Sequence, residues 1–135
     1  MNKNKSGLLL AAILLMVSVL ACGGSISTAN ISSAWMATDE EGNNPTTTFP
    51  QDAIFYAIVD LKNAPDDTKV KAVWTVVEAE GTEPNLMLNE TEITSGDGLI
   101  HFQLENTDYL WPLGQYKVDI YLNDKLDQTL TFEVQ

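Results

Sequence analysis

The C-terminal third of the chain carries an alternating pattern that constrains the fold more than any other stretch. In residues 115–122 apolar side chains occupy every second position, and after the polar residues 123–125 the pattern resumes with Leu130, Phe132 and Val134. A period of two over both segments predicts a β-hairpin with a turn at Asn123-Asp124-Lys125, one buried face and one exposed face. Because an isolated hairpin is unstable in water, the rest of the chain must supply a second sheet that covers the buried face.

Further short segments of the same kind precede this hairpin. The expected strands are residues 34–38, 46–49, 53–62, 69–80, 86–94 and 99–105. Turns rich in Gly, Asn, Asp and Pro separate them, and no stretch beyond residue 33 has helical periodicity over more than a turn or two. Strands that recur at such short spacing predict an all-β sandwich or barrel, formed by one domain of residues 34–135.

The N-terminal segment has the parts of a secretory signal peptide. Lys3 and Lys5 precede an almost unbroken apolar run over residues 7–21, and Leu20-Ala21 stands directly before Cys22, the one cysteine of the chain. The pattern resembles a bacterial lipobox, so we expect residues 1–21 to be removed and the sulfur of Cys22 to be diacylated with fatty acids such as palmitate. An uncleaved transmembrane anchor is the alternative, but an apolar run of about 15 residues is short for a bilayer that needs ~20.

The segment after the lipid site differs in composition from the domain. Residues 22–33 are small or polar and carry no charge, which indicates a flexible tether between lipid and domain. Ile26 and Ile31 also allow a short strand near its end. With Cys22 lipidated, the mature chain can form no intramolecular disulfide, and its stability rests on its apolar core.

The acidity of the mature chain excludes some partners. Of the 7 basic residues, Lys3 and Lys5 precede the lipid site, so residues 22–135 carry 5 basic and 19 acidic side chains, a net charge of −14 (5 − 19). This field repels the phosphates of nucleic acids and anionic lipid headgroups. We therefore expect no nucleic-acid partner, and membrane attachment through the lipid on Cys22. High net charge also favours solubility.

Two aromatic residues point to a particular type of sandwich. Leu113-Gly114-Gln115-Tyr116 places a tyrosine at the start of the penultimate strand, and Trp74 lies on the apolar side of an earlier strand. These positions resemble the tyrosine corner and the core tryptophan of immunoglobulin domains, although Val118 stands where antibody domains have their second disulfide cysteine. The run from Trp111 to Val118 is also similar to immunoglobulin-like modules of bacterial secreted proteins and lipoproteins. The resemblance implies an antiparallel immunoglobulin-like sandwich of about seven strands over residues 34–135, with no shared catalytic residues.

The sequence offers few residues for catalysis or metal binding. The one histidine, His101, alternates away from the apolar face of its expected strand, and no nucleophile motif such as G-x-S-x-G is present. One histidine and one lipidated cysteine cannot form a zinc site. Calcium takes clustered oxygen ligands, and the candidates, which match no calcium-loop motif, are Asp39, Glu41, Asp66, Asp67 and Asp97. We predict no catalytic residues and no cofactor.

Together these features predict a non-catalytic, lipid-anchored, extracytoplasmic module with a binding or structural role at the cell envelope. We expect it on the cell membrane or the outer membrane of a bacterium, in contact with a protein partner that the sequence does not identify. The alternative is a calcium-dependent or small-ligand-binding adhesion module, which a melting temperature that rises with calcium would favour.

Overall fold

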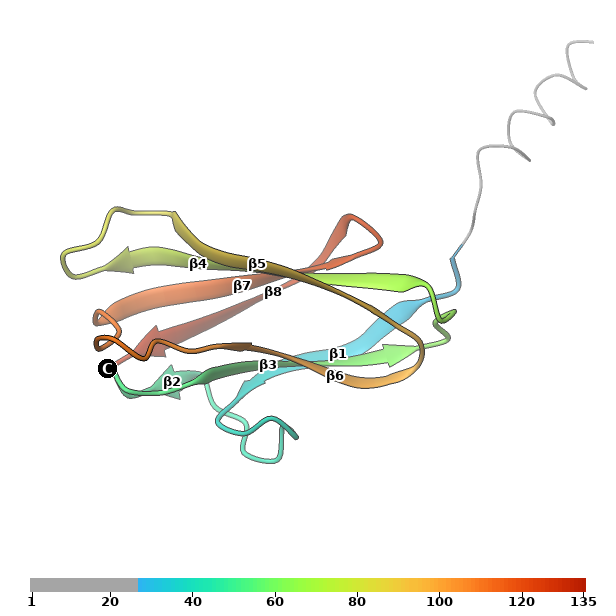
Figure 1. The fold of residues 1–135 in the computed structure, drawn as a ribbon, viewed down its shortest axis with the longest axis horizontal. Coiled ribbons are helices and arrows are strands. Elements are labelled where there is room, and N and C mark those ends of the chain that lie inside the picture. The colour runs from blue at the N-terminus through green and yellow to red at the C-terminus, as the bar shows by residue number, and fades with distance from the viewer. Residues whose placement is uncertain (1–26) are drawn as a thin grey trace, which may run out of the picture.

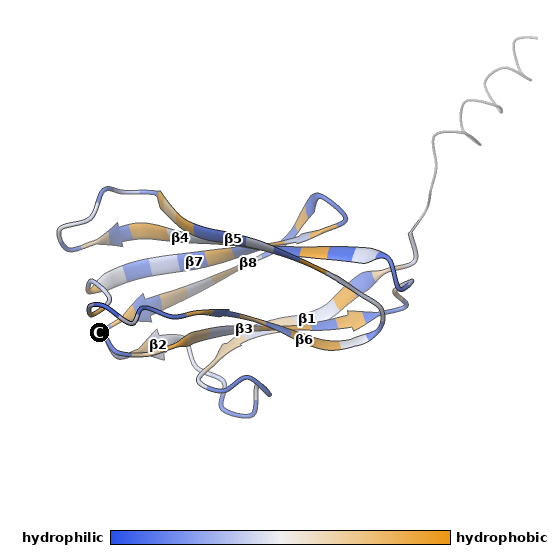
Figure 2. Ribbon diagram, viewed as in Figure 1, coloured by the Kyte–Doolittle hydropathy of each residue, from blue (hydrophilic) through white to orange (hydrophobic). Residues whose placement is uncertain are grey.

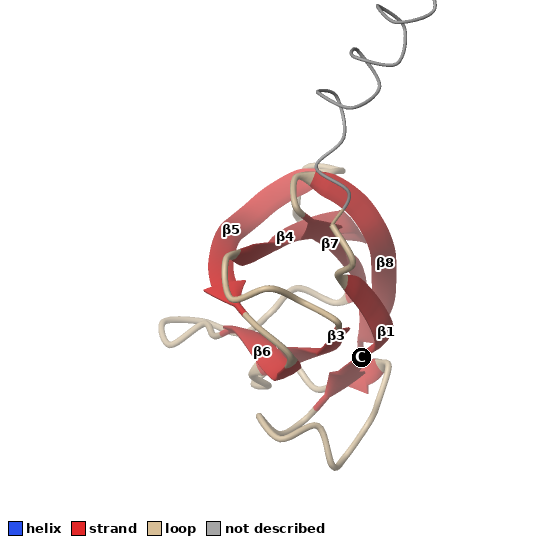
Figure 3. Cartoon of the chain, turned by 90° about the vertical axis from the view of Figure 1, so that its right-hand side faces the viewer, coloured by secondary structure: helices blue, strands red, loops and turns tan. Residues whose placement is uncertain are grey.

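The computed structural model describes residues 27–135, which form two stacked β-sheets (Figure 1, Figure 3). The strands are β1 (Asn30–Ala37), β2 (Thr48–Phe49), β3 (Phe55–Lys62), β4 (Thr68–Ala79), β5 (Leu86–Ser95), β6 (Gly98–Leu104), β7 (Gly114–Leu122) and β8 (Lys125–Val134). One sheet has the order β1-β3-β6 and the other β2-β8-β7-β4-β5. Paired strands are antiparallel except β2 and β8, which are parallel. No helix in the described range is long and apolar enough to cross a membrane.

The core lies between the two sheets, and the apolar faces expected from the sequence form it. Figure 2 shows apolar and polar residues alternating along the strands of both sheets. The residues of β3 and β4 that belong to this core are Phe55, Ala57, Val59, Leu61, Val70, Ala72, Trp74 and Val76. In the C-terminal hairpin Tyr116, Val118, Ile120, Phe132 and Val134 are buried as predicted. The expectation of an all-β sandwich is therefore confirmed.

Aromatic rings fill one end of this core around Phe55. The Phe55 ring centroid lies 4.7 Å from that of Trp111, 4.8 Å from that of Phe132 and 5.7 Å from that of Tyr116. Buried aromatic side chains contribute more apolar area than other residues, and offset or edge-on pairs add to that stabilisation. The Trp111 indole N–H donates to the carbonyl of Ala53 (2.8 Å), so its one polar group is satisfied.

The expected tyrosine corner is present. The hydroxyl of Tyr116, which is 1% exposed, donates to the carbonyl of Pro112 at 2.6 Å, four residues upstream. Burial raises the pKa of this hydroxyl to about 12. Gly114 (φ +153°) allows the close approach of β7 to β4, because a Cβ there would collide with the backbone of Glu78 and Ala79.

The turn of the C-terminal hairpin is shorter than the expected three residues. Lys125 already pairs with Leu122, so only Asn123 (φ +47°) and Asp124 (φ +68°) form the connection. Two successive residues with positive φ are typical of a type I′ turn, whose twist matches that of the flanking strands. Just after this turn Asp127 is an extra residue of β8, because Tyr121 pairs with Leu126 and Ile120 pairs with Gln128.

The first strand begins earlier than the sequence suggested. β1 starts at Asn30, so residues 30–33, expected to be part of the tether, are paired with β3. Ile31 is buried and lies opposite Leu61, but the register shifts between Ile31 and Ser33. Because one extra residue breaks the alternation, Ala34 continues the inward face of Ile31 at a spacing of three. The bulge thus hid the first half of the strand from a search for period two.

A loop covers part of the outer face of the three-stranded sheet. Residues 38–44 connect β1 towards β2, and the carbonyl of Gly42 accepts the indole N–H of Trp35 at 3.0 Å. A Cβ on Gly42 would lie 2.9 Å from both Trp35 and Ile58, so the loop packs closely on them. Ile58 is fully buried although it faces away from the main core. This explains why β3, the central strand of its sheet, is apolar on both sides.

Candidate functional site

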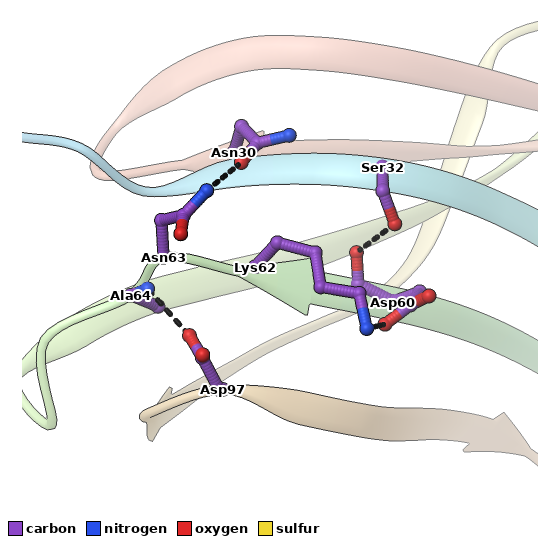
Figure 4. A network of polar contacts seen from close by, with 7 residues as sticks. All are labelled: Asn30, Ser32, Asp60, Lys62, Asn63, Ala64 and Asp97. Atoms are coloured by element: carbon purple, nitrogen blue, oxygen red, sulfur yellow. Dashed lines mark hydrogen bonds and ion pairs between the residues drawn. The ribbon is translucent and has the colours of Figure 1, made fainter.

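Turn residues fix the end of the sandwich at which the described chain begins. The hydroxyl of Thr28 donates to the carbonyl of Asn63 (2.8 Å), and the side-chain amide of Asn123 donates to the hydroxyl of Ser27 (3.4 Å). Figure 4 shows that Asn63 also donates through its side chain to Asn30 Oδ1 (3.4 Å). Residues 27–28 therefore lie beside the β3–β4 and β7–β8 turns, and we call this region the N-terminal end.

Three of the calcium candidates are located at the N-terminal end. Asp66 and Asp67 are exposed in the β3–β4 turn, and Asp97 is exposed in the β5–β6 turn. Asp97 Oδ1 accepts the backbone N–H of Ala64 at 2.6 Å, which ties the two turns together (Figure 4). Asp66 lies close to Gly96, because a Cβ on that glycine would be 2.6 Å from Asp66 Oδ1. The turns that carry Asp66 and Asp97 are thus in contact.

The other two calcium candidates, Asp39 and Glu41, belong to the loop of residues 38–44. Both carboxylate oxygens of Asp39 accept backbone N–H groups, from Asn43 at 2.9 Å and from Asn44 at 2.8 Å. The bond from Asn43, followed by that from Asn44, holds the pKa of Asp39 below its usual value. Figure 1 places this loop beneath the three-stranded sheet, apart from the β3–β4 turn.

The five calcium candidates are not assembled into one site. Within residues 27–135 no group of three or more His, Cys, Asp or Glu side chains could hold a metal ion. Asp39 accepts two backbone N–H groups and Asp97 accepts one, so these two carboxylates stabilise turns.

His101 is on the exposed face of β6, as the alternation predicts. Its side chain is 42% exposed, and Nε2 lies 4.0 Å from Glu40 Oε2. Its ring centroid is 6.2 Å from that of Tyr56 on the neighbouring strand. In the described part of the chain no hydroxyl is hydrogen-bonded to His101, so the geometry is that of a surface histidine rather than of a nucleophile–base pair.

A groove of about 540 Å³ lies between β1 and β8. We call it the seam groove. Its lining residues are Ala34, Trp35, Met36, Pro45, Thr46, Thr47, Thr129, Leu130 and Thr131. None of these residues is charged. Reasoning from the sequence missed this groove because its walls are strand edges, and alternation reveals the faces of a strand but not which strands lie beside it.

The end of the sandwich opposite the N-terminal end exposes large apolar side chains. Tyr109 and Leu110 in the β6–β7 loop are 74% and 58% exposed, and Leu86 and Met87 at the start of β5 are 41% and 58% exposed. We call this region the far end. In Figure 1 the β4–β5 and β6–β7 loops lie at the side away from residue 27. Exposed aromatic and apolar side chains on loops are common at binding surfaces.

Known proteins resemble this chain in fold. No protein-family model matches it, and no curated protein is similar to it in sequence. An immunoglobulin-like protein from Pseudomonas aeruginosa superposes with a TM-score of 0.53 and 17% identity, over 83% of this chain and 100% of that one. The fold is immunoglobulin-like. A Pseudomonas fluorescens alkylpurine DNA glycosylase, AlkC, bound to DNA with an abasic site analogue, superposes with a TM-score of 0.52 and 14% identity, over 81% of this chain and 31% of that one.

These likenesses concern the fold alone. The expected immunoglobulin-like sandwich, with its tyrosine corner and core tryptophan, is confirmed. The expected signal peptide (residues 1–21), the lipid site Cys22 and residues 23–26 of the tether lie outside the described residues.

Proposed function

We propose that this chain is a lipid-anchored, extracytoplasmic immunoglobulin-like module with a non-catalytic binding role at the bacterial cell envelope. Lys3, Lys5, the apolar run and Leu20-Ala21-Cys22 support lipid attachment at Cys22. The immunoglobulin-like fold supports a binding or structural role, because such a scaffold holds loops and strand edges rigidly at its surface.

The observation that carries this proposal is the position of residues 27 and 28. Their hydrogen bonds to Asn123 and Asn63 fix the start of the domain at the N-terminal end. Ser27 follows Cys22 by five residues, a segment that spans at most ~18 Å. A lipid on Cys22 would therefore attach the N-terminal end to the bilayer, and the far end with Tyr109 and Leu110 would point away from it.

Two features support a role without catalysis. His101 is a surface residue with one long ion-pair contact, and the acidic residues Asp39 and Asp97 are engaged in turns. Within residues 27–135 these side chains thus contribute to a surface and to turns.

The lipid attachment is tested by metabolic labelling of the full-length chain in a bacterial host with an alkyne analogue of palmitate. We expect label on the wild-type protein and cleavage before Cys22. In Cys22→Ser we expect loss of the label and an unprocessed precursor, since the serine oxygen does not replace the thiol as the lipid acceptor. The matched control is Ser25→Ala, which leaves the lipobox intact and should be labelled fully.

The binding role is tested in the same cells with a cleavable amine-reactive crosslinker. We expect a discrete adduct of the anchored wild-type protein with one partner. A Cys22→Ser protein that is still cut at the same bond and still partitions into detergent would refute the lipid anchor. Absence of any adduct from an anchored, folded wild-type protein would refute the binding role.

A further inference from the structure

The outer edge of β8 is only partly paired. The N–H of Glu133 donates to the carbonyl of Thr47 at 2.8 Å, so the backbone groups of Glu133 point away from β7. Backbone direction alternates along an antiparallel strand, so Thr131 and Thr129 point the same way as Glu133. Within the described chain, β2 pairs with β8 only opposite Glu133 and Val134. The edge groups of Thr129 and Thr131 therefore have no strand beside them and face the seam groove.

The edge of β1 that faces β8 is also only partly paired. The carbonyl of Met36 accepts the N–H of Thr46 at 3.0 Å, so the backbone groups of Met36 point away from β3. By the same alternation Ala34 points into the seam groove, and within residues 27–135 its edge groups have no strand partner either. Both walls of the groove thus present backbone donors and acceptors.

The chain itself shows how an extended segment fits between these edges. Thr46 donates to β1 through its N–H, and the adjacent Thr47 accepts from β8 through its carbonyl. Two successive residues therefore connect both sheets at one end of the seam groove. Beyond them the same arrangement of edge groups continues along Thr129 and Thr131, without a segment of residues 27–135 between the walls.

The floor and size of the seam groove suit a short strand. Ala34 and Leu130 are half-buried and pack against the core together with the buried Met36, so the floor is apolar. The volume of about 540 Å³ is within the usual range of ligand sites. Three residues from Thr129 to Thr131 provide ~10 Å of strand edge for pairing.

We propose that the seam groove binds an extended peptide segment of a partner protein, which adds a strand to the outer edge of β8. This inference rests on the proposed binding role and specifies the partner's chemistry. Edge N–H and C=O groups are satisfied by an extended backbone, and the apolar floor accepts an aliphatic side chain at alternate positions. The uncharged lining requires an uncharged centre, whereas the acidic surroundings, with 5 basic and 19 acidic residues from residue 22 onwards, favour lysines at the flanks.

The test uses the full-length protein in detergent micelles and the synthetic peptide KKVTVTVKK as the probe. Nuclear magnetic resonance of the backbone amides measures both binding and its location. We expect the amide signals of Thr129 and Thr131 to shift and their hydrogen exchange to slow at least tenfold. The amides of Glu90 and Glu92, which point outward from the edge strand β5 on the other side of the sandwich, should stay unchanged. The same peptide with N-methylated valines is the control, because it keeps the side chains and loses backbone donors.

Two variants separate backbone pairing from side-chain contact. Thr131→Pro removes the edge N–H and leaves the ladder with β7, whose donors on β8 are the even-numbered neighbours Leu130 and Phe132, so binding should weaken about tenfold or more. Thr131→Ala keeps the N–H and should bind within about twofold of wild type. Circular dichroism checks that both variants are folded. If Thr131→Pro is not folded, the amide shifts and hydrogen exchange of the wild-type protein test strand addition by themselves.

Four results would overturn the inference. These are no binding of the probe at millimolar concentration, amide shifts that do not include Thr129 and Thr131, equal affinity of the N-methylated peptide, and occupation of the groove edge by a second copy of the chain in sedimentation and crosslinking. If the anchored protein forms its envelope adduct but its seam groove does not bind the peptide, the proposed function stands and this inference is wrong.

Discussion

The hydroxyl of Tyr116 offers the sharpest test of the fold. It donates to the carbonyl of Pro112 at 2.6 Å, and the ring packs against Phe132 at a centroid distance of 5.5 Å. Tyr116→Phe keeps that packing and removes the hydrogen bond alone. The cost should lie between the net value of one hydrogen bond and that of a buried acceptor left unpaired, ~1–3 kcal/mol. Since Pro112 is half-buried and its carbonyl can recover some hydration, we expect ~1–2 kcal/mol.

Tyr121 provides the matched control in the same strand. Its side chain has the opposite direction, is half-buried, and lies under Lys71, whose Nζ is 4.6 Å from the ring centroid. Phenylalanine retains a ring face for this cation, so Tyr121→Phe should change the free energy of unfolding by less than ~0.5 kcal/mol. Each substitution removes one phenolic oxygen atom, and the two cases differ in the surroundings of that oxygen.

Alkaline pH gives a second measurement on the same hydroxyl. Burial raises the pKa of Tyr116 to about 12 from its ordinary value of 10.0, so the unfolded chain loses this proton first. The stability contributed by the neutral hydroxyl is therefore complete below pH ~10 and is lost as the pH rises towards ~12. Tyr116→Phe should remove this part of the alkaline destabilisation, whereas Tyr121→Phe should keep it.

Urea denaturation of the wild type, Tyr116→Phe and Tyr121→Phe measures these differences in the free energy of unfolding. The three curves are fitted with one common slope of free energy against urea concentration. Equal costs for the two substitutions, or a larger cost at Tyr121, would show that Tyr116 makes no such bond or that the faces of β7 are reversed. An unchanged alkaline titration in Tyr116→Phe would separately refute the assigned burial of the hydroxyl.

Two backbone positions give further predictions, measured by the same denaturation assay. Gly114→Ala should cost ~3–5 kcal/mol, because its Cβ would overlap the backbone of Glu78 in a positive-φ position. Gly81→Ala, also at positive φ but with no atom within 4 Å of its Cβ, should cost only ~1–2 kcal/mol, and equal costs would contradict the steric argument. Asp124→Gly should raise the free energy of unfolding by ~0.5–1 kcal/mol, since Asn123-Gly suits a type I′ turn, and a decrease would refute that turn.

The sequence predicts those parts of the fold in which alternation reports burial directly. The faces of β4 and β7 follow from period two, so the alternation alone places Trp74 and Tyr116 in the core. The tyrosine corner could be predicted as well, because its donor and acceptor are four residues apart in one segment. Local sequence patterns are sufficient to predict a contact when the contacting residue is close in the chain, or when the side chain simply packs into the core.

The parts that could not be predicted depend on distant backbone. The bulge after Ile31 breaks the alternation, and β2 is too short for any period to show. The parallel pairing of Thr48 and Phe49 with the end of β8 has no local signal, since it follows from the route of the chain between the two sheets. The role of Asp39, in contrast, depends on nearby residues. It accepts two N–H groups from its own loop, and the pattern Asp-x-x-Gly-Asn-Asn could have suggested such a turn.

The edge strands on the two sides of the sandwich differ in charge, and this difference bears on where a strand can be added. β5 is the last strand of the five-stranded sheet, and it carries the exposed carboxylates Glu90 and Glu92. Glu90 Oε1 lies 3.3 Å from Lys71 Nζ on β4, so an ion pair links this edge strand to its neighbour. Charged side chains on an edge strand oppose pairing with another chain. Thr129 and Thr131, at the edge of β8, carry no charge and face an uncharged groove. The charge distribution therefore disfavours strand addition at β5 and permits it at the edge of β8.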